Sequence, residues 1–216
     1  MIYISEFIGS FFLVATVIGS GIMGNNLSPD NSAVALLGNT IATGAILFVI
    51  IKMFGKISGA HFNPAVSMVF FLRKELEFSK LVKYIFFQLL GGLFAVAIIH
   101  YIFNQEIIQV STHPMRVENA PWSLLVSEII ATTGLLLTIL FVRKNDENSV
   151  AIAVALFITA GYWFTSSTSF ANPAVTISRI FTDTFTGISP MQAVYFMLGQ
   201  IIGCFAGHGI FKTFEE

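Results

Sequence analysis

Two stretches of the sequence set an amide side chain and a proline between apolar residues, and both read Asn-Pro-Ala-Val, at residues 63–66 and 172–175. An Asn at such a point can cap a helix, because its side-chain oxygen accepts hydrogen bonds from free N–H groups of the first turn. Pro suits the first helical position, where its missing N–H costs nothing, and the small Ala lets two helix tips approach closely. The residues expected at this meeting point are Asn63, Pro64, Ala65, Asn172, Pro173 and Ala174.

The chemistry expected of two such caps is hydrogen bonding to a neutral molecule. Each Asn uses its oxygen for capping, so its NH₂ group can point toward the space between the motifs. Two half-helices arriving from opposite faces of a membrane would also bring two positive dipole ends together. Such a site can hydrogen-bond the oxygen of a passing neutral molecule while it repels protons and cations. The motifs therefore predict the middle of a pore.

Two acidic residues, Glu6 and Glu128, lie within apolar stretches, where an ionisable side chain suggests a functional role. They could carry protons in a coupled transporter. Alternatively, they could accept hydrogen bonds from irregular backbone ahead of each motif, near residues 58–62 and 168–171. Their matching positions in the two halves of the chain favour the second, structural role.

The segments before the two motifs are expected to supply backbone acceptors to the pore. A run of carbonyl groups is predicted on each side, from Gly59, Ala60 and His61 and from Ser169, Phe170 and Ala171. The His61 side chain could gate this path, or it could pack or face the cytoplasm, and the sequence leaves both alternatives open. The other histidines have no spacing typical of a metal site, so no metal or other cofactor is expected.

The composition places these motifs in a membrane protein. The chain has 216 residues, of which 55% are hydrophobic and 11% charged, and its mean hydropathy is +0.81. Soluble domains carry roughly 25% charged residues, so an ordinary soluble fold is excluded. The net charge of −1 gives no indication of nucleic-acid binding, and the single cysteine, Cys204, cannot form an internal disulfide.

The hydropathy pattern predicts six spans of the length that crosses a bilayer as a helix. They cover residues 3–24, 33–54, 79–103, 122–142, 150–168 and 190–211. Two shorter apolar pieces, 64–72 and 173–181, each begin at an Asn-Pro and are too short to cross alone. Non-helical backbone persists at membrane depth only where protein or water surrounds it, so each piece predicts a re-entrant half-helix.

The distribution of basic residues predicts which side of the membrane holds the termini. With both termini in the cytoplasm, the outer side holds only Arg116 and Arg179. The inner set is Lys52, Lys56, Arg73, Lys74, Lys80, Lys83, Arg143, Lys144 and Lys212. This bias follows the positive-inside rule, so we expect a multi-pass protein of the cell membrane (inner or plasma) with both termini cytoplasmic.

The two halves of the chain repeat the same order of polar residues: a Glu in the first span, then an Asn-Pro-Ala motif, then a Gln in the last span. Gln88 and Gln200 complete this order and are expected to brace the pore from within the bundle. Because each half has three spans, the second half must enter the membrane from the opposite side. The predicted fold is an all-α membrane protein, one channel domain over 1–216, with six transmembrane helices and two re-entrant half-helices in an inverted 3+3 repeat. The repeats cover about 1–103 and 122–216, and a loop at about 104–121 connects them.

The chain resembles the major intrinsic protein family, the aquaporins and aquaglyceroporins. The resemblance extends over essentially the whole chain and is most specific in SGAHFNPAV at 58–66 and in the second Asn-Pro-Ala. It implies six spans plus two half-helices, a pore in each protomer and a homotetramer. It also implies passive conduction of water or small uncharged solutes.

The sequence departs from most members of the family at the narrow outer filter, where an Arg usually follows the second motif and this chain has Val175. Counting back without gaps, the other filter positions fall on Thr43, Ala160 and Ser169, and a slip of one position would replace Ala160 by Gly161. This set would form a wide ring without a fixed cation. A similar filter occurs in a bacterial branch associated with metalloid or small-solute passage, which favours a solute-permissive channel over a strictly water-selective one.

Arg179 follows Val175 by one helical turn and lies on nearly the same face of the half-helix. It could overhang the outer mouth, or it could pair with Asp183 away from the pore. A proton-coupled transporter is the alternative from another class, and it would need Glu6 and Glu128 to titrate in the pathway. An enzyme is not expected, because the sequence has no metalloprotease motif or serine-hydrolase elbow.

Overall fold

The computed structural model describes residues 1–113 and 121–215, and within these ranges the regular elements are all helical. The long helices are α1 (Ile2–Leu27), α2 (Ser32–Ser58), α4 (Phe78–Ile102), α5 (Pro121–Asn145), α6 (Val150–Phe164, preceded by the 3₁₀ turn η1, Glu147–Ser149) and α8 (Pro190–Thr213). The short helices are α3 (Pro64–Leu72) and α7 (Pro173–Arg179). In the described part of the chain, six helices are long and apolar enough to cross a membrane. The predicted all-α fold with six spans is confirmed.

The predicted boundaries differ by four residues at two ends: α2 continues to Ser58 beyond the predicted 54, and the fifth span, which the sequence extends to residue 168, ends earlier. The structure ends α6 at Phe164, and Thr165 has an extended backbone (φ −116°, ψ 143°). The polar residues after Phe164 hydrogen-bond to other parts of the protein instead of continuing the helix. Ser167, for example, donates its hydroxyl hydrogen to the Glu128 carboxylate. The predicted half-helix 173–181 also ends early, at Arg179. Arg116 and residues 114–120 of the predicted connecting loop lie outside the described residues.

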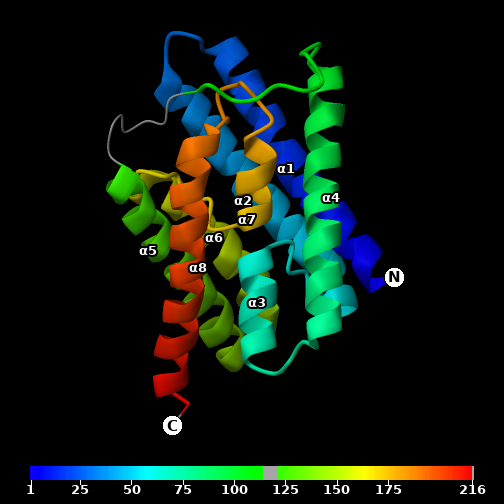
Figure 1. The fold of residues 1–216 in the computed structure, drawn as a ribbon, viewed down its shortest axis with the longest axis vertical. Coiled ribbons are helices and arrows are strands. Elements are labelled where there is room, and N and C mark those ends of the chain that lie inside the picture. Colours follow the sequence, from blue (N-terminus) through cyan, green and yellow to red (C-terminus); the bar gives the residue numbers. More distant parts are fainter. Residues whose placement is uncertain (114–120, 216) are drawn as a thin grey trace.

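The two half-helices lie nearly end to end inside the bundle, with their N-terminal tips meeting in the middle (Figure 1). From this meeting point α3 runs toward the end of the bundle where the C-terminus lies, and α7 runs toward the opposite end. We call the first of these the basic end, because the helix ends and connections there carry nine Lys and Arg residues. They are Lys52, Lys56, Arg73, Lys74, Lys80, Lys83, Arg143, Lys144 and Lys212.

Glycines let the first and last long helices of each half pack closely, α1 on α4 and α5 on α8. A Cβ added to Gly91 of α4 would lie 2.3 Å from the carbonyl oxygen of Phe7 on α1. A Cβ added to Gly203 of α8 would lie 2.8 Å from the carbonyl oxygen of Ile129 on α5. Small residues at such crossings are typical of helix packing in membranes, where backbones approach each other directly. The two halves therefore use the same contact.

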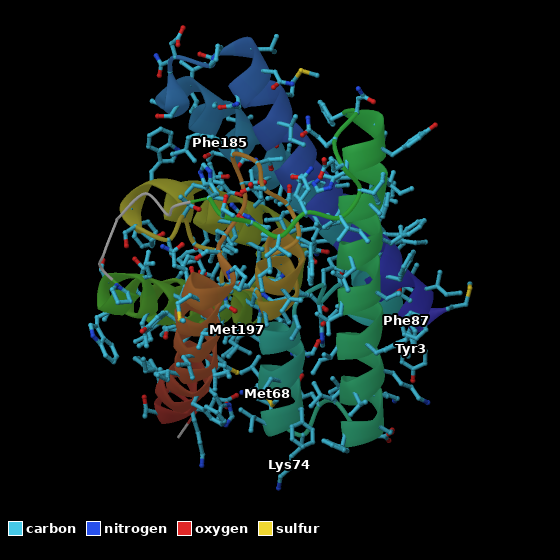
Figure 2. All side chains as sticks on the ribbon, turned by 45° about the horizontal axis from the view of Figure 1, so that its top comes forward. Tyr3, Met68, Lys74, Phe87, Phe185 and Met197 are labelled. Carbon is cyan, nitrogen blue, oxygen red and sulfur yellow. The ribbon has the colours of Figure 1, made fainter. Side chains whose placement is uncertain are left out.

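The outward faces of the long helices are apolar, as lipid contact requires. Exposed examples are Ile41, Phe86, Ile130, Leu156 and Phe205. At the N-terminal end of α1, Tyr3 stacks on Phe87 of α4 with ring centroids 5.7 Å apart, and both side chains project from the bundle (Figure 2). The inward faces form the buried core, which includes Ile18, Ile50, Leu136 and Phe196.

Candidate functional site

The meeting point of the half-helices is built from two asparagine caps. The Asn63 side-chain oxygen accepts from the Ala65 N–H at 2.8 Å, and that of Asn172 accepts from the Ala174 and Val175 N–H groups at 3.0 and 3.3 Å. Each following Pro is the first residue of its helix, at the position where no N–H is needed.

The two asparagines also join the motifs to each other. Asn63 Nδ2 donates to the Ala171 carbonyl at 2.7 Å, and Asn172 Nδ2 donates to the Phe62 carbonyl at 2.8 Å. An amide NH₂ group has two hydrogens, so each crossing bond uses one of them. The asparagines thus cap their own helices and lock the opposite loop with the same side chain.

Glu6 of α1 organises the backbone ahead of the first motif. Its carboxylate accepts from the Ser58 hydroxyl at 2.6 Å and from the backbone N–H groups of His61 and Phe62 at 3.0 and 2.7 Å. Gln88 of α4 donates to the same carboxylate at 2.7 Å. The residue is fully buried, so these bonds supply the partners that a buried carboxylate needs.

Glu128 of α5 does the same for the second motif. Its carboxylate accepts from the Ser167 hydroxyl at 2.5 Å and from the N–H groups of Phe170 and Ala171 at 3.0 and 2.8 Å. Gln200 of α8 donates to it at 2.6 Å. These contacts are the ones expected if Glu6 and Glu128 accept hydrogen bonds from the irregular backbone, the structural role that the sequence favoured.

Two kinds of contact in these networks were not expected from the sequence. Gln88 also donates to Ser67, and Gln200 to Thr176, at 3.0 and 2.8 Å. Each of these hydroxyl residues lies four positions after its Asn, and the serines Ser58 and Ser167 lie five positions before it. This matched spacing was the signal that could have found them.

The backbone that the glutamates hold is in the left-handed region in both halves. Positive φ occurs at Gly59 (84°), Ala60 (51°), Phe62 (48°), Thr168 (59°), Ser169 (53°) and Ala171 (46°). A non-glycine residue in a sparsely populated backbone region costs roughly 1–3 kcal/mol and persists only where its surroundings fix it. The carboxylates of Glu6 and Glu128 fix it here.

One cavity of about 650 Å³ passes both asparagines. At the basic end its lining includes Lys52, Lys56 and Arg143, and at the other end it includes Val175 and Arg179. The Pro and Ala residues of the motifs form the helix tips, whereas the Asn and Val residues of both motifs, Asn63, Val66, Asn172 and Val175, line the cavity. Glu6, Glu128, Gln88 and Gln200 stand behind this lining, fully buried.

Most of the predicted carbonyl-bearing residues line this cavity, namely Gly59, Ala60, His61, Ser169 and Phe170. Ala171 is the exception and corrects the prediction. Its carbonyl accepts the amide of Asn63, and the residue is fully buried. The Ala171 carbonyl therefore joins the two motifs.

The structure brings three of the four predicted filter residues to the cavity: Thr43, Ser169 and Val175. Ala160 was predicted wrongly. It is exposed on the outer face of α6, on the stripe that also carries Leu156. Two residues further along, Tyr162 is buried, lines the cavity, and pairs with the Thr43 hydroxyl at 3.1 Å. Gly161, the alternative filter residue, is not part of the cavity lining either, because it packs against Ser169.

Arg179 is 4% exposed and lines the cavity one turn beyond Val175. Its guanidinium lies 3.6 Å from the centroid of the Phe170 ring, and its Nε donates to the Thr186 carbonyl. The Asp183 carboxylate accepts from the backbone N–H and hydroxyl of Thr112, at 2.8 and 3.0 Å. The guanidinium therefore belongs to the cavity wall, as the first of the two alternatives for Arg179 requires.

His61 is packed and also lines the cavity. Its ring stacks on Phe70 with centroids 4.7 Å apart, its Nδ1 lies 3.1 Å from the Ser67 hydroxyl, and Tyr84 meets it edge-on at 5.2 Å. In the described residues, no group of three or more His, Cys, Asp or Glu side chains is placed to hold a metal ion. The cavity wall at this level is aromatic.

An ion-pair cluster forms part of the cavity rim at the basic end. Glu75 accepts from Arg143 Nη1 at 2.6 Å and from Arg73 Nε at 2.7 Å, and Arg73 also binds both carboxylate oxygens of Glu215. Partial burial alone would raise the pKa of Glu75, but the hydrogen bonds and positive charges of Arg143 and Arg73 outweigh it and lower that pKa.

A cavity that runs lengthwise through membrane-spanning helices and past two capped half-helices makes this protein a membrane channel. The family model described as Major intrinsic protein matches residues 2–149 and 142–216. The chain is 44% identical over 200 residues to Aquaglyceroporin AqpS of Rhizobium meliloti (strain 1021), which covers 93% of this chain and 84% of the relative. The chain therefore belongs to the major intrinsic protein family.

Two more distant similarities extend over nearly the whole chain. Aquaporin NIP2-2 of Zea mays is 28% identical over 221 residues, covering 99% of this chain and 71% of that relative. The X-ray structure of the aquaglyceroporin from Plasmodium falciparum superposes with a TM-score of 0.73 at 26% identity, covering 99% of this chain and 93% of that one. The helical architecture is thus shared with a solved channel.

Proposed function

We propose that this protein is a passive channel that conducts water and small uncharged solutes, such as glycerol-like polyols or metalloid acids, and excludes protons and ions. The observation that carries the proposal is the pair of crossing asparagines in the cavity, Asn63 to Ala171 and Asn172 to Phe62. Each amide keeps a second N–H, and these donors lie where two half-helix N-termini meet. Donors and positive dipole ends favour a neutral acceptor such as a water or hydroxyl oxygen and oppose a cation.

Two features support passage of solutes larger than water. Val175 occupies the position where most relatives carry a guanidinium, and its side chain lines the cavity. The similarity to a relative named as an aquaglyceroporin points the same way. A strictly water-selective channel is the second candidate. It is favoured by Tyr162 and Arg179, whose large side chains both lie in the cavity wall. The sequence did not predict these two side chains together in the wall.

A proton-coupled transporter is disfavoured by the hydrogen bonding of Glu6 and Glu128, the two carriers that the sequence suggested. The Glu6 and Glu128 carboxylates each accept from two backbone N–H groups, a serine and a glutamine, behind the cavity lining. Protonating either would break bonds that hold the irregular backbone. The chain belongs to a family of channels, and we propose that it is a channel without enzymatic activity.

We further propose that residues 1–216 form one channel domain, that the basic end faces the cytoplasm together with both termini, and that the protein assembles as a homotetramer in the cell membrane. The orientation is supported by the basic residues gathered at one end. The assembly is supported by the family resemblance.

Stopped-flow measurements on proteoliposomes test the function. Vesicles with the protein should transport water, and glycerol, urea or arsenous acid, faster than protein-free vesicles, at rates unaffected by ionophores. A vesicle-trapped pH dye should report no added proton leak. Water transport alone would favour the water-selective candidate, whereas solute uptake that follows a proton gradient would overturn the channel proposal.

A further inference from the structure

A lysine and two aromatic rings share one outward surface at the basic end, where α1 and α4 begin. Tyr3 of α1 stacks on Phe87 of α4 with ring centroids 5.7 Å apart, and both side chains project from the bundle (Figure 2). The Lys83 ammonium lies over the Tyr3 ring, 5.4 Å from its centroid. This cation–π contact attracts the ammonium to the ring, so the lysine has a defined place on the surface.

The polar tips of Lys83 and Tyr3 keep their hydrogen-bonding capacity. Within the described residues, Lys83 forms no ion pair and the Tyr3 hydroxyl has no hydrogen-bond partner. An ammonium has three donors and a phenol hydroxyl has one, and here the ammonium lies over the ring that carries the hydroxyl. A single anion with several acceptor oxygens can therefore bind both.

The inverted repeat does not require a lysine at this position. Lys83 lies five residues before Gln88, and the residue five before Gln200 is Tyr195. Tyr195 meets Trp122 of α5 edge-on, with ring centroids 6.0 Å apart, at the other end of the bundle. The two halves thus share an aromatic surface, and the first half adds a cation to it. The positive-inside rule accounts for a basic residue at this end, but not for its place over an aromatic ring.

An apolar stripe continues from Lys83 toward the middle of the bundle. Phe86, Leu90 and Phe94 of α4 are exposed and follow Lys83 at intervals of three or four residues, so they lie on one face of the helix. Phe94 also contacts Phe11 of α1, with ring centroids 5.8 Å apart. A cation at the end of a span with an apolar stripe below it matches a phospholipid, whose phosphate lies at the interface and whose acyl chains extend inward.

We propose that Lys83 and Tyr3 form a binding site for the headgroup of an anionic phospholipid whose acyl chain lies along α4. The ammonium supplies the positive charge, and the Tyr3 hydroxyl donates a hydrogen bond to a phosphate oxygen. The site lies at the end that we propose to face the cytoplasm, and the cytoplasmic leaflet carries the anionic lipids. The inference goes beyond the proposed function, because lipid binding does not depend on what the channel transports.

The proposed site is two aromatic contacts away from the cavity. The Tyr3 ring meets Tyr84 edge-on at 6.0 Å, and Tyr84 meets His61 edge-on at 5.2 Å. The Tyr84 hydroxyl also donates to the Ser58 carbonyl at 2.8 Å, and Tyr84, His61 and Ser58 all line the cavity. A lipid that holds Tyr3 against α4 therefore stabilises the contacts that support the first motif. Binding should raise the melting temperature of the protein.

The test is a lipid titration of the purified protein in detergent, followed by its melting temperature, because a ligand of the folded state raises that temperature. Dioleoylphosphatidylglycerol, which is anionic, should raise it. Dioleoylphosphatidylcholine has the same acyl chains without net charge, and it should have little effect, as should inorganic phosphate. In Lys83→Gln the half-saturating concentration of the anionic lipid should rise roughly 5-fold, the contribution of one basic residue at an anionic lipid surface. Tyr3→Phe keeps the ring and loses one hydrogen bond, so it should raise that concentration roughly 2- to 10-fold.

Lys212→Gln is the matched control, because Lys212 is exposed in the last turn of α8 at the same end of the bundle. It should titrate as wild type, and Lys83→Arg, which keeps the charge, should retain binding. Each variant is compared with its own lipid-free melting temperature, so a lower starting stability does not affect the result.

The proposal is overturned if the zwitterionic lipid or inorganic phosphate raises the melting temperature as much as the anionic lipid does. It is also overturned if Lys83→Gln titrates as wild type, or if Lys212→Gln weakens binding as much as Lys83→Gln, because the lipid would then respond to the general charge of this end. A wild-type titration of Tyr3→Phe would overturn the role of the Tyr3 hydroxyl. The measurement involves no transport, so a failure of the proposed function would be seen separately in the proteoliposome assay.

Discussion

Glu6 and Glu128 make the same set of hydrogen bonds in the two halves of the chain. Each carboxylate accepts from one serine hydroxyl, two backbone N–H groups and one glutamine amide. Each therefore fixes the left-handed backbone that delivers an asparagine to the middle of the bundle. The two half-helices meet in a defined geometry because the side chains of two buried glutamates hold the loops before them.

Replacing Glu128 by Gln should destabilise the protein more than it changes selectivity. The new NH₂ group would face donors, the Ala171 N–H and the Gln200 amide, in place of an acceptor. Hydrogen bonds to charged groups contribute about 1.5–3 kcal/mol each, so the melting temperature in detergent should drop by several degrees. Any flux that remains should be independent of pH.

Glu106→Gln is the matched control, since Glu106 is exposed in the connection after α4. Its melting temperature should equal that of wild type. If Glu128→Gln instead keeps wild-type stability and abolishes uptake driven by a pH gradient, Glu128 carries protons and the transporter hypothesis returns.

Asn63→Asp should damage the pore centre. The carboxylate can still cap α3, but it loses the donor that reaches the Ala171 carbonyl at 2.7 Å. It also places a negative charge where the helix dipoles repel cations. We expect lower expression or a cation leak, measured with a potential-sensitive dye in proteoliposomes.

Asn172→Asp should behave in the same way, because Asn172 makes the reciprocal bond to Phe62. Asn104→Asp, at an exposed position after α4, is the control and should conduct as wild type. Normal expression with unchanged water flux and full proton exclusion in both motif variants would contradict the pore-centre assignment.

The rim at the basic end should loosen in acid. The pKa of Glu75 is lowered in the folded protein, so its contribution to stability is present above the ordinary carboxyl pKa. That contribution is lost as the pH falls from the ordinary carboxyl pKa through the lowered pKa of Glu75. The protection of residues 73–77 against hydrogen exchange, after correction for the intrinsic exchange rate at each pH, should therefore fall in that window. Glu75→Gln should show fast exchange already at neutral pH, and equal pH profiles for both proteins would refute the ion-pair account.

Much of the fold could be predicted because its signals are local. Asn63 followed by Pro64 encodes a cap and a first helical residue, and the length of each apolar run encodes a span. The matched order of Glu, Asn-Pro-Ala and Gln encodes the inverted repeat. The caps and spans depend on neighbours in sequence, whereas the repeat shows in the order of residues along each half, and the structure contains these elements at nearly the predicted boundaries.

The details of the cavity wall depend on rotation and distance in space. Counting back from Asn172 led to Ala160, but a count along the chain cannot give the rotation of α6 about its axis. The structure turns Ala160 outward and Tyr162 inward. Likewise, the Asn63 bond to Ala171 joins residues far apart in sequence, and only the packed bundle reveals it.

Val175→Arg should convert the channel toward water selectivity. The new guanidinium would enter a wall that already holds Thr43, Tyr162 and Ser169, and it would narrow the cavity there. Its donors favour small permeants that hydrogen-bond strongly. It would also lie one turn from Arg179, so two like charges would face each other on one helix face. Glycerol and arsenous acid permeability should therefore fall much more than water permeability.

Arg179→Ala tests the native cation by itself. The Arg179 guanidinium lies over Phe170 at the cavity wall, so its loss should raise the ratio of solute permeability to water permeability. The measurement is that ratio in proteoliposomes for wild type and both variants. If wild type already excludes glycerol, urea and arsenous acid, Tyr162 and Arg179 close the cavity to solutes, and Arg179→Ala should then be the variant that admits them.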